Sequence, residues 1–294
     1  MVALAFGVAV IALTAFIAWH LFSSSAASRA KLGWAFLFSR TWDPVTGEFG
    51  AAPFLYGTLV TSAIALLVAV PLGVGVAIFL SELAAPRLSS AIGLLLELLA
   101  AVPSVIYGLV GIAVLVPLMR TVIEPALKGA FRGFPLFTGP SYGVGFLTAG
   151  LVLAVMVVPF IVSVGREVLL AVPREQREGA LALGSTRWES VWHVVLPHAK
   201  AGLYGAIFLA LGRALGETMA VTMVIGNRPE IAASLLAPGY SMAAVIANEF
   251  TEATGDLYLS ALIEIGLVLF ALTMVVNAAA RLLIIATARK GSGT

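Results

Sequence analysis

The chain has 294 residues, of which 61% are hydrophobic and 11% are charged, with a mean hydropathy of +1.06 and a formal net charge of +2. Soluble domains carry about 25% charged residues, so this composition excludes an ordinary soluble protein and indicates a helical integral membrane protein. The small net charge gives no argument for nucleic-acid binding, and the absence of cysteine excludes disulfides and a thiolate metal site. The three histidines have no metal-ligand spacing, so no metal site is expected.

Six stretches of the chain are apolar enough and long enough to cross a membrane. About 20 residues of helix cover a hydrocarbon core of roughly 30 Å at 1.5 Å per residue. The first stretch is longer than the apolar part of a signal peptide and has no basic residues before it, so a retained helix is favoured over a cleaved signal. The sequence therefore predicts an all-α membrane protein with six spans: Val2–Leu21, Leu55–Leu80, Ala91–Leu118, Tyr142–Val164, Leu203–Gly226 and Leu257–Ala286.

Proline and loop composition refine this plan. Pro103 falls inside the third predicted span, where it removes a helix hydrogen bond and predicts a break or kink. The segments 23–54, 119–141 and 227–256 are richer in glycine, proline and aromatic residues, and we place them on the outer side of the membrane, with helices along the interface as one form that some of them can take. No shift in composition marks a separate soluble domain, so residues 1–294 are expected to form one transmembrane domain.

The segment 172–197, between the fourth and fifth spans, reads VPREQREGALALGSTRWESVWHVVLP. Acidic residues near its start suit the N-terminus of a helix, and Gly184 permits a sharp reversal. Ser185 or Thr186 can cap a second short helix, and Pro197 is expected to end that helix before the fifth span. The same features also fit an ordinary amphipathic loop in the cytoplasm.

Two charged residues lie inside the fifth predicted span. Arg213 lies ten residues beyond Leu203, which places it about 15 Å into the core and near its midplane. Glu217 is one helical turn further on the same predicted face. A charge at this depth is costly and usually faces a cavity or a partner. This favours a functional role over the alternative, a self-neutralising pair packed inside the bundle.

The chemistry of this pair is that of an oxyanion site. The guanidinium of Arg213 offers a planar fork that matches two oxygens of a phosphate or a sulfate. The carboxylate of Glu217 repels a fully deprotonated anion but accepts a hydrogen bond from a protonated one, so the pair favours phosphate. Ser104, next to Pro103, is a candidate pore-lining residue, and a hydrogen bond to the backbone is the alternative role for its hydroxyl.

The segment 172–197 resembles the EAA loop of bacterial ABC-importer permeases, whose pattern is E-A-A-x3-G-x9-I-x-L-P. Gly179 stands in place of the usual alanine and Val194 in place of the usual isoleucine. The residues that match or align with the pattern and are expected to couple to the ATPase are Glu178, Gly179, Ala180, Gly184, Leu196 and Pro197.

Further stretches extend the resemblance over nearly the whole chain from Trp42 onward. They include Trp42-Asp43-Pro44, ELLAAVPSVIYG at 97–108, GRALGETMA at 212–220 and AAVIANEF at 243–250. Together these stretches are similar to the permease subunits of the phosphate-specific ABC importer, and to the PstC type more than to the PstA type.

The resemblance implies the architecture of a type I ABC-importer permease, with 172–197 as a cytoplasmic coupling loop. It implies a permease subunit that forms, with a homologous second permease, the transmembrane path for inorganic phosphate by alternating access. The other implied partners are two ATPase subunits, which bind ATP and magnesium, and an extracytoplasmic phosphate-binding protein. The chain has no G-x4-G-K-[ST] phosphate loop, so we expect it to be neither an enzyme nor the holder of a cofactor.

The resemblance also implies which residues line the anion path and how the chain is oriented in the membrane. In this family the Arg-x3-Glu element of the fifth span is associated with the anion path, which corresponds here to Arg213 and Glu217. A cytoplasmic coupling loop and six spans place both termini in the cytoplasm of a multi-pass protein of the bacterial cytoplasmic membrane. The distribution of lysine and arginine gives only a weak signal in the same direction.

Two other functions fit part of the sequence. A permease for another oxyanion, such as sulfate or molybdate, would share the coupling loop but would not require a proton acceptor in its path. A secondary transporter driven by an ion gradient would predict an inverted repeat with two matched broken helices. No convincing internal repeat is present, and a coupling loop would have no role in such a transporter. Dependence of transport on an ATPase separates these classes.

Overall fold

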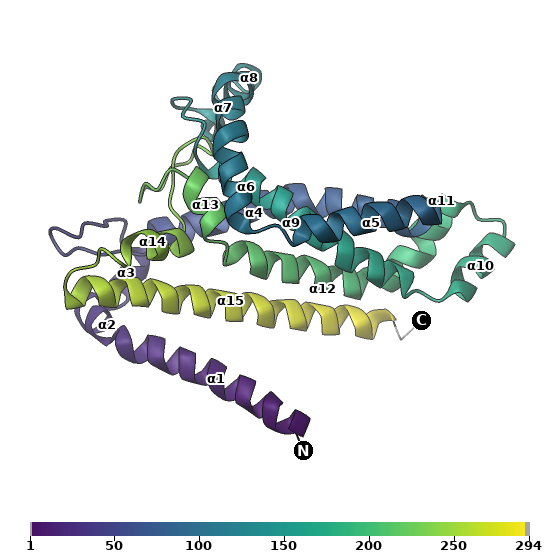
Figure 1. Ribbon diagram of the computed structural model, residues 1–294, viewed down its shortest axis with the longest axis horizontal. Helices are drawn as coiled ribbons and strands as arrows, with labels where there is room; N and C mark the ends of the chain where they lie inside the picture. The colour runs from purple at the N-terminus through teal and green to yellow at the C-terminus, as the bar shows by residue number, and fades with distance from the viewer. Residues whose placement is uncertain (1, 292–294) are drawn as a thin grey trace.

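The computed structural model describes residues 2–291, which form a helical bundle elongated along one axis (Figure 1). Apart from two isolated bridges, the described residues contain no β-structure. Wider, π-type turns extend α4 to Leu83, join α6, α7 and α8 into one helical run, and join α11 to α12. The helices are α1 (Val2–Ser24), α2 (Ala26–Leu32), α3 (Ala35–Phe38), α4 (Ala52–Ile78), α5 (Pro86–Ala100), α6 (Ser104–Val110), α7 (Val116–Leu118), α8 (Glu124–Ala130), α9 (Phe146–Leu170), α10 (Arg174–Ala182), α11 (Arg187–Ser190), α12 (Leu196–Leu215), α13 (Met219–Val224), α14 (Met242–Glu249) and α15 (Asp256–Gly291).

Six helical runs within the described residues are long and apolar enough to cross a membrane, which confirms the predicted number. In lipid each backbone N–H and C=O must be satisfied within the chain, and a helix does this inside each segment. The runs are Ala3–Ser24, Ala52–Leu83, Ser104–Ala130, Phe146–Leu170, Arg187–Leu215 and Asp256–Ala286.

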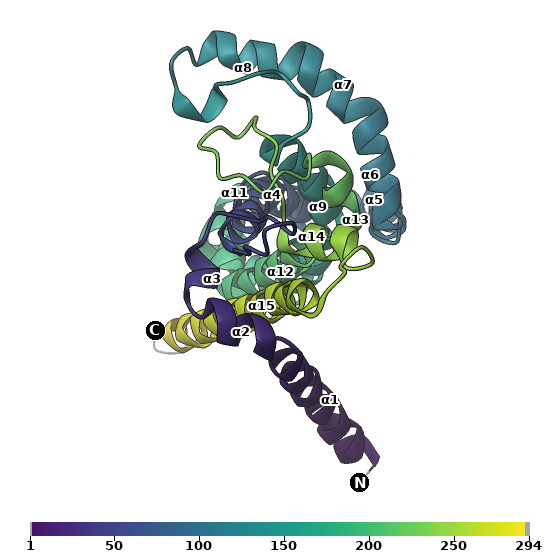
Figure 2. The ribbon, with the colours of Figure 1, turned by 90° about the vertical axis from the view of Figure 1, so that its left-hand side faces the viewer.

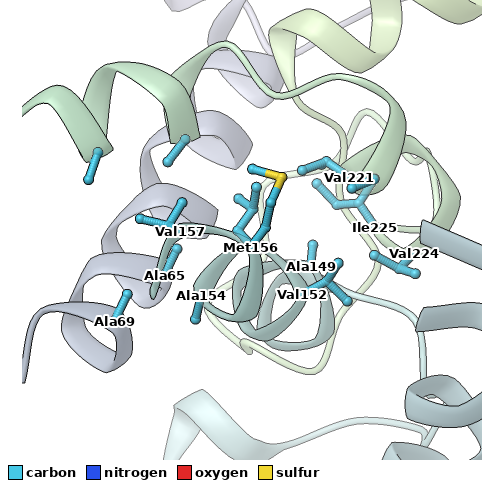
Figure 3. Packing of buried hydrophobic residues seen from close by; sticks show 14 of the residues in the cluster. Ala65, Ala69, Ala149, Val152, Ala154, Met156, Val157, Val221, Val224 and Ile225 are labelled. Carbon is cyan, nitrogen blue, oxygen red and sulfur yellow. The ribbon is translucent and has the colours of Figure 1, made fainter. Parts of the chain in front are cut away.

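The core of the bundle forms where α9 packs against α4 and α12 (Figure 3). Ala65 and Ala69 of α4 and Ala149 of α9 are fully buried at this contact. A Cβ on Gly150 of α9 would lie 2.5 Å from the side chain of Ile64 on α4, so only glycine permits this approach. Small residues let membrane helices pack closely, and the resulting dispersion contacts stabilise the bundle.

The third span differs from the single helix predicted over 91–118. α5 ends at Ala100 and α6 begins at Ser104, so the predicted break at Pro103 is confirmed. α5 lies along the bundle, whereas α6, α7 and α8 run across it as an arm at its edge (Figures 1 and 2). The membrane-length run is therefore the arm, and α5 is a separate helix of 15 residues.

The fifth span also differs from the prediction of one helix over 203–226. α12 ends at Leu215, and α13 is a separate helix after a turn. Pro197 does not end the preceding helix, because it lies in the first turn of α12, after the π-type turns that join α11 to α12. The wider turns over 191–195 change the hydrogen-bond spacing just before the proline, so the helical run is continuous from Arg187 despite the missing N–H.

The three predicted outer segments contain helices as well as loops. The segment 23–54 holds α2 and α3, and the segment 227–256 holds α14. In the segment 119–141 the arm continues as a helix to Ala130, so the helical run extends beyond Leu118, where the third span was predicted to end.

The two ends of the bundle carry different elements, and we name them after α10 and α14. The first residues of α1 and the last residues of α15 point toward the α10 end, whereas α2, α3 and α14 lie at the other end (Figure 1). At the α14 end the Trp42 ring packs edge-on against Phe49 and Phe54, with centroids 4.9 and 4.8 Å away. Its Nε1 donates a hydrogen bond to the carboxylate of Glu249 at 2.8 Å, which ties the segment after α3 to α14.

Candidate functional site

Arg213 and Glu217 lie on either side of the point where α12 ends. Arg213 is in the last turn of α12, and it is exposed on the surface of this chain. Glu217 lies in the turn that follows, where its Oε1 accepts a hydrogen bond from the N–H of Ala220 at 3.2 Å. The prediction that both residues share one helical face is wrong, because the helix ends at Leu215 before it reaches Glu217. Within the described residues no ion pair joins Arg213 to Glu217, so the self-neutralising pair is not formed.

The break in the third span lies beside the break in the fifth. Gly108 of α6 packs against α13, where an added Cβ would lie 2.5 Å from Met223 Sδ and 3.2 Å from Ala220 Cα. One residue earlier, the hydroxyl of Tyr107 donates to the carbonyl of Leu99 at 2.7 Å and lies within electrostatic range of Arg213. Contact between α6 and α13 therefore brings Tyr107, at the third-span break, close to the arginine of the fifth span.

Ser104 is the first residue of α6, immediately after the break. It is half-buried, and in the described part of the chain its hydroxyl has no hydrogen bond to the backbone. The alternative role considered for this serine, a bond to its own helix, is therefore not realised. Of the two hydroxyl groups on the first turn of α6, that of Tyr107 already donates its proton to Leu99, so the Ser104 hydroxyl is the available donor.

This arrangement can bind an anion. Non-helical backbone at membrane depth is tolerated where it is buried in protein or lines a water-filled cavity. Here the segments that follow two such breaks, α6 and α13, pack together, with an exposed guanidinium at one break and the Ser104 hydroxyl at the other. By contrast, no group of three or more histidine, aspartate or glutamate side chains in the described residues could hold a metal ion.

The loop 172–197 forms two short helices with a sharp turn between them, as the sequence predicted. Gly184 makes the turn with φ of +91°, a conformation that residues with a side chain rarely adopt. Thr186 caps α11: its hydroxyl accepts from the N–H of Glu189 at 3.2 Å, and the Glu189 carboxylate accepts from the N–H of Thr186 at 2.7 Å. This reciprocal capping box fixes where the second helix begins.

The residues of the predicted coupling set lie on the surface of the loop or at its junction with α12. Glu178, Gly179, Gly184 and Pro197 are exposed, and Ala180 and Leu196 are partly exposed. Leu183, at the turn, is 90% exposed, and Trp188 on α11 is 52% exposed. An apolar surface of this kind at the tip of a loop is typical of a protein–protein contact.

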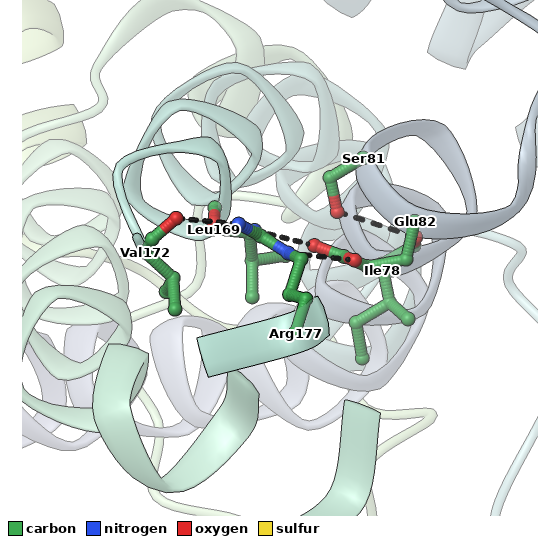
Figure 4. Close-up of polar contacts among 6 residues, drawn as sticks. All are labelled: Ile78, Ser81, Glu82, Leu169, Val172 and Arg177. Atoms are coloured by element: carbon green, nitrogen blue, oxygen red, sulfur yellow. Dashed lines mark hydrogen bonds and ion pairs between the residues drawn. The ribbon is translucent and has the colours of Figure 1, made fainter. Parts of the chain in front are cut away.

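Sequence reasoning did not find the residue that holds α10 to the membrane helices. Arg177 of α10 forms an ion pair with Glu82, at the end of the helical run that begins with α4, and also donates to carbonyls at the end of α9 (Figure 4). The sequence gives one indication of this ion pair at Glu82. An acidic residue at a helix C-terminus interacts unfavourably with the helix dipole, and a basic partner offsets this. Tyr107 was also missed, because its position beside Arg213 depends on how α6 packs.

A family model described as "Binding-protein-dependent transport system inner membrane component" matches residues 69–286. The phosphate transport system permease protein PstC of Mesorhizobium japonicum is 49% identical over 90% of this chain and 82% of its own length. The protein of the same name from Xylella fastidiosa Temecula1 is 50% identical over 88% of this chain and 81% of its own length. A probable PstC from Methanocaldococcus jannaschii is 39% identical over 80% of this chain and 75% of its own length.

Two solved structures show the same fold at low identity. An inward-facing structure of the MetNI methionine ABC transporter covers 79% of this chain and 91% of its own, with a TM-score of 0.55 and 18% identity. A bacterial ABC transporter that imports alginate covers 86% of this chain and 88% of its own, with a TM-score of 0.55 and 17% identity. The chain therefore has the type I ABC-importer permease architecture, and it belongs to the family of binding-protein-dependent transport system inner membrane components, among the PstC-type permeases.

Proposed function

We propose that the chain is a permease subunit of an ATP-driven importer and forms half of the transmembrane path for inorganic phosphate. Its relatives from Mesorhizobium japonicum and Xylella fastidiosa are named phosphate transport permeases. The observation that carries the proposal is the exposed guanidinium of Arg213 at the break in the fifth span, which forms no ion pair within the described residues. A planar guanidinium in this position matches two oxygens of a tetrahedral oxyanion.

Arg213, Glu217 and Ser104 are the residues that contact the substrate in this proposal. The hydrogen bond from Ala220 holds one carboxylate oxygen of Glu217 in place, and the other oxygen accepts a hydrogen bond from a protonated oxygen of the anion. At neutral pH phosphate carries one or two protons and sulfate carries none, so Glu217 attracts phosphate by a hydrogen bond and repels sulfate by charge. The hydroxyl of Ser104 adds a donor on the opposite break.

A second, homologous permease supplies the other wall of the path. Arg213 is exposed in the isolated chain, and a charged side chain facing lipid would be costly. Pairing with a second permease encloses Arg213 and leaves a path between the two chains. Alternating access then follows from movement of one permease against the other.

Two ATPase subunits dock at the α10 end, where the coupling set is exposed, and they bind the ATP and magnesium that this chain does not. An extracytoplasmic phosphate-binding protein delivers the anion at the α14 end. This orientation places both termini in the cytoplasm, in agreement with α1 and α15 pointing their terminal ends toward α10 (Figure 1).

The proposal is tested by uptake of labelled phosphate into proteoliposomes that hold the complete complex. We expect uptake that requires ATP inside, the binding protein outside, and both permeases, and that an excess of sulfate does not inhibit. Uptake of sulfate with the same requirements would show that the substrate is another oxyanion and not phosphate. Uptake driven by an ion gradient without the ATPase would refute the importer itself.

A further inference from the structure

α10 is the part of the coupling loop that is least attached to the membrane helices. None of its nine residues, all of which the structure describes, is buried. The buried apolar contacts of the loop lie on either side of α10. Val172 before α10, and Val191 and Val195 after it, belong to one buried cluster that also contains Leu80, at the end of the run that begins with α4. Apolar packing therefore holds the two ends of the loop, whereas α10 lies against the 191–195 turns and α11 without a buried residue of its own.

Arg177 is the residue of α10 that forms hydrogen bonds at the ends of the α4 run and of α9 (Figure 4). Its Nη2 and Nε donate to the two carboxylate oxygens of Glu82 at 2.8 and 3.1 Å. Nη2 also donates to the carbonyl of Leu169 at 2.7 Å, and Nη1 donates to the carbonyl of Val172. We call this set of contacts the Arg177 bridge. A bidentate arginine–carboxylate pair has a fixed geometry as well as a charge, so the bridge fixes the angle of α10 and not only its distance.

The acceptors of the Arg177 bridge belong to the ends of two core helices. Glu82 lies in the last turn of the run that begins with α4, and Leu169 lies in the last turn of α9. The last carbonyls of a helix have no partner within it, and a cation there interacts favourably with the helix dipole. One guanidinium thus binds the cytoplasmic ends of both helices that form the centre of the bundle.

Open space surrounds the bridge on both sides. A cleft of about 550 Å³ lies between α10 and the helix ends, lined by Ser81, Glu82, Leu170, Arg174, Arg177 and Glu178. A second cleft of about 300 Å³, lined by Glu82, Arg177, Leu181, Arg187, Ser190 and Val191, lies on the other side. The side chains of Arg177 and Glu82 are only 18% and 10% exposed, so the pair stands between the clefts and is itself largely shielded from water.

We propose that Arg177 is the positioning residue that makes α4 and α9 move with α10 when the ATPases close. This inference rests on the proposed function, because it assigns a role within the coupling of ATP hydrolysis to transport. α10 has no buried apolar residue through which its displacement could move the membrane helices. The bridge transmits this displacement to α4 and α9, whereas without the bridge α10 moves into the clefts beside it.

The test is a double-mutant cycle on the reconstituted complex, with phosphate transported per ATP hydrolysed as the readout. We expect Arg177→Gln to lower this ratio about tenfold, a change equivalent to roughly 1.4 kcal/mol of coupling, while ATP hydrolysis stays within about twofold of wild type. Glu82→Gln lowers the ratio less, because Arg177 keeps its bonds to the carbonyls of Leu169 and Val172. The double variant is no worse than Arg177→Gln, since both changes remove one interaction.

The control is Arg174→Gln, which removes an exposed positive charge from the same helix. It is expected to keep the wild-type ratio, and an equal loss in both variants would overturn the proposal in favour of a general charge effect on ATPase docking. Losses that multiply in the double variant would also overturn it. If Arg177→Gln does not assemble with the ATPases, Arg177→Lys replaces it, because an ammonium keeps the charge but lacks the fork. A wild-type ratio in Arg177→Lys would then contradict the proposal.

A second readout separates failure of this inference from failure of the phosphate assignment. The chain has no cysteine, so spin labels can be attached at two introduced cysteines, Leu181→Cys on α10 and Leu83→Cys at the end of the α4 run. We expect ATP binding to leave the distance between them unchanged with Arg177 present and to change it in Arg177→Gln. If wild-type complexes hydrolyse ATP but take up no phosphate, the assignment of phosphate as the substrate is refuted, and the distance measurement still tests the role of Arg177. The same distance change with and without Arg177 would refute the bridge whatever the substrate.

Discussion

Gly184→Ala tests whether the turn between α10 and α11 sets the docking surface for the ATPase. Gly184 has φ of +91°, and an added Cβ would meet no atom within 4 Å. Any effect of the substitution therefore comes from the backbone conformation and not from a clash. Gly179→Ala is the matched control, because Gly179 lies in the same loop and its Cβ would also meet no atom within 4 Å, but its backbone is helical.

The two substitutions are expected to act in opposite directions. A left-handed conformation costs a residue with a Cβ about 1–2 kcal/mol, so Gly184→Ala disfavours the turn by that amount. Gly179→Ala stabilises α10 by roughly 0.5–1 kcal/mol, because alanine loses less conformational freedom in a helix than glycine. If the ATPase binds the turned loop, Gly184→Ala weakens the association by roughly 5- to 30-fold, and Gly179→Ala leaves it unchanged or slightly tighter.

The assay is the affinity of the purified ATPase for the permease pair in nanodiscs, measured for wild type and both variants. Hydrogen exchange of the loop amides checks that Gly184→Ala changes the turn and leaves the membrane helices protected. Equal affinities for the two variants would refute the reasoning, since the turn conformation would then have no part in docking.

The remaining predictions concern the stability of the bundle. Gly57→Ala on α4 is expected to lower the melting temperature strongly, because its Cβ would lie 2.0 Å from the carbonyl oxygen of Tyr240, and overpacking costs about 1–3 kcal/mol or more. Gly75→Ala on the same helix, where a Cβ meets nothing within 4 Å, is expected to leave it unchanged or raise it; equal melting temperatures would contradict the close approach. Glu249→Ala is expected to destabilise the α14 end by about 1–3 kcal/mol, because it removes the acceptor of Trp42 Nε1, and wild-type protection from proteolysis there would contradict this.

Short-range sequence signals correctly predicted the features that depend only on residues close together in the chain. The number of spans follows from hydropathy, because a lipid environment leaves the helix as the only economical structure for an apolar segment. In the coupling loop, glycine at a turn and threonine before an acidic residue three positions later are short-range signals, and both Gly184 and Thr186 act as expected. Pro103 likewise marked the break in the third span.

The features that sequence reasoning missed depend on contacts between distant segments. A proline indicates that a helix breaks, but the angle between α5 and α6 depends on the packing of Gly108 against α13. The spacing of Arg213 and Glu217 implies a shared face only while the helix continues, and α12 ends between them. Arg177 and Glu82 are 95 residues apart, and only the folded bundle brings them together.

Phosphate uptake by the Arg213→Gln complex tests the central claim most directly, with Arg132→Gln as the control for loss of an exposed arginine that is part of neither break. Hydrogen bonds to charged groups contribute about 1.5–3 kcal/mol, so we expect Arg213→Gln to lower uptake roughly 10- to 100-fold in a complex that still assembles and hydrolyses ATP. Arg132→Gln is expected to transport as wild type. Wild-type uptake by an assembled Arg213→Gln complex would show that the anion crosses the membrane without this guanidinium and would contradict the account.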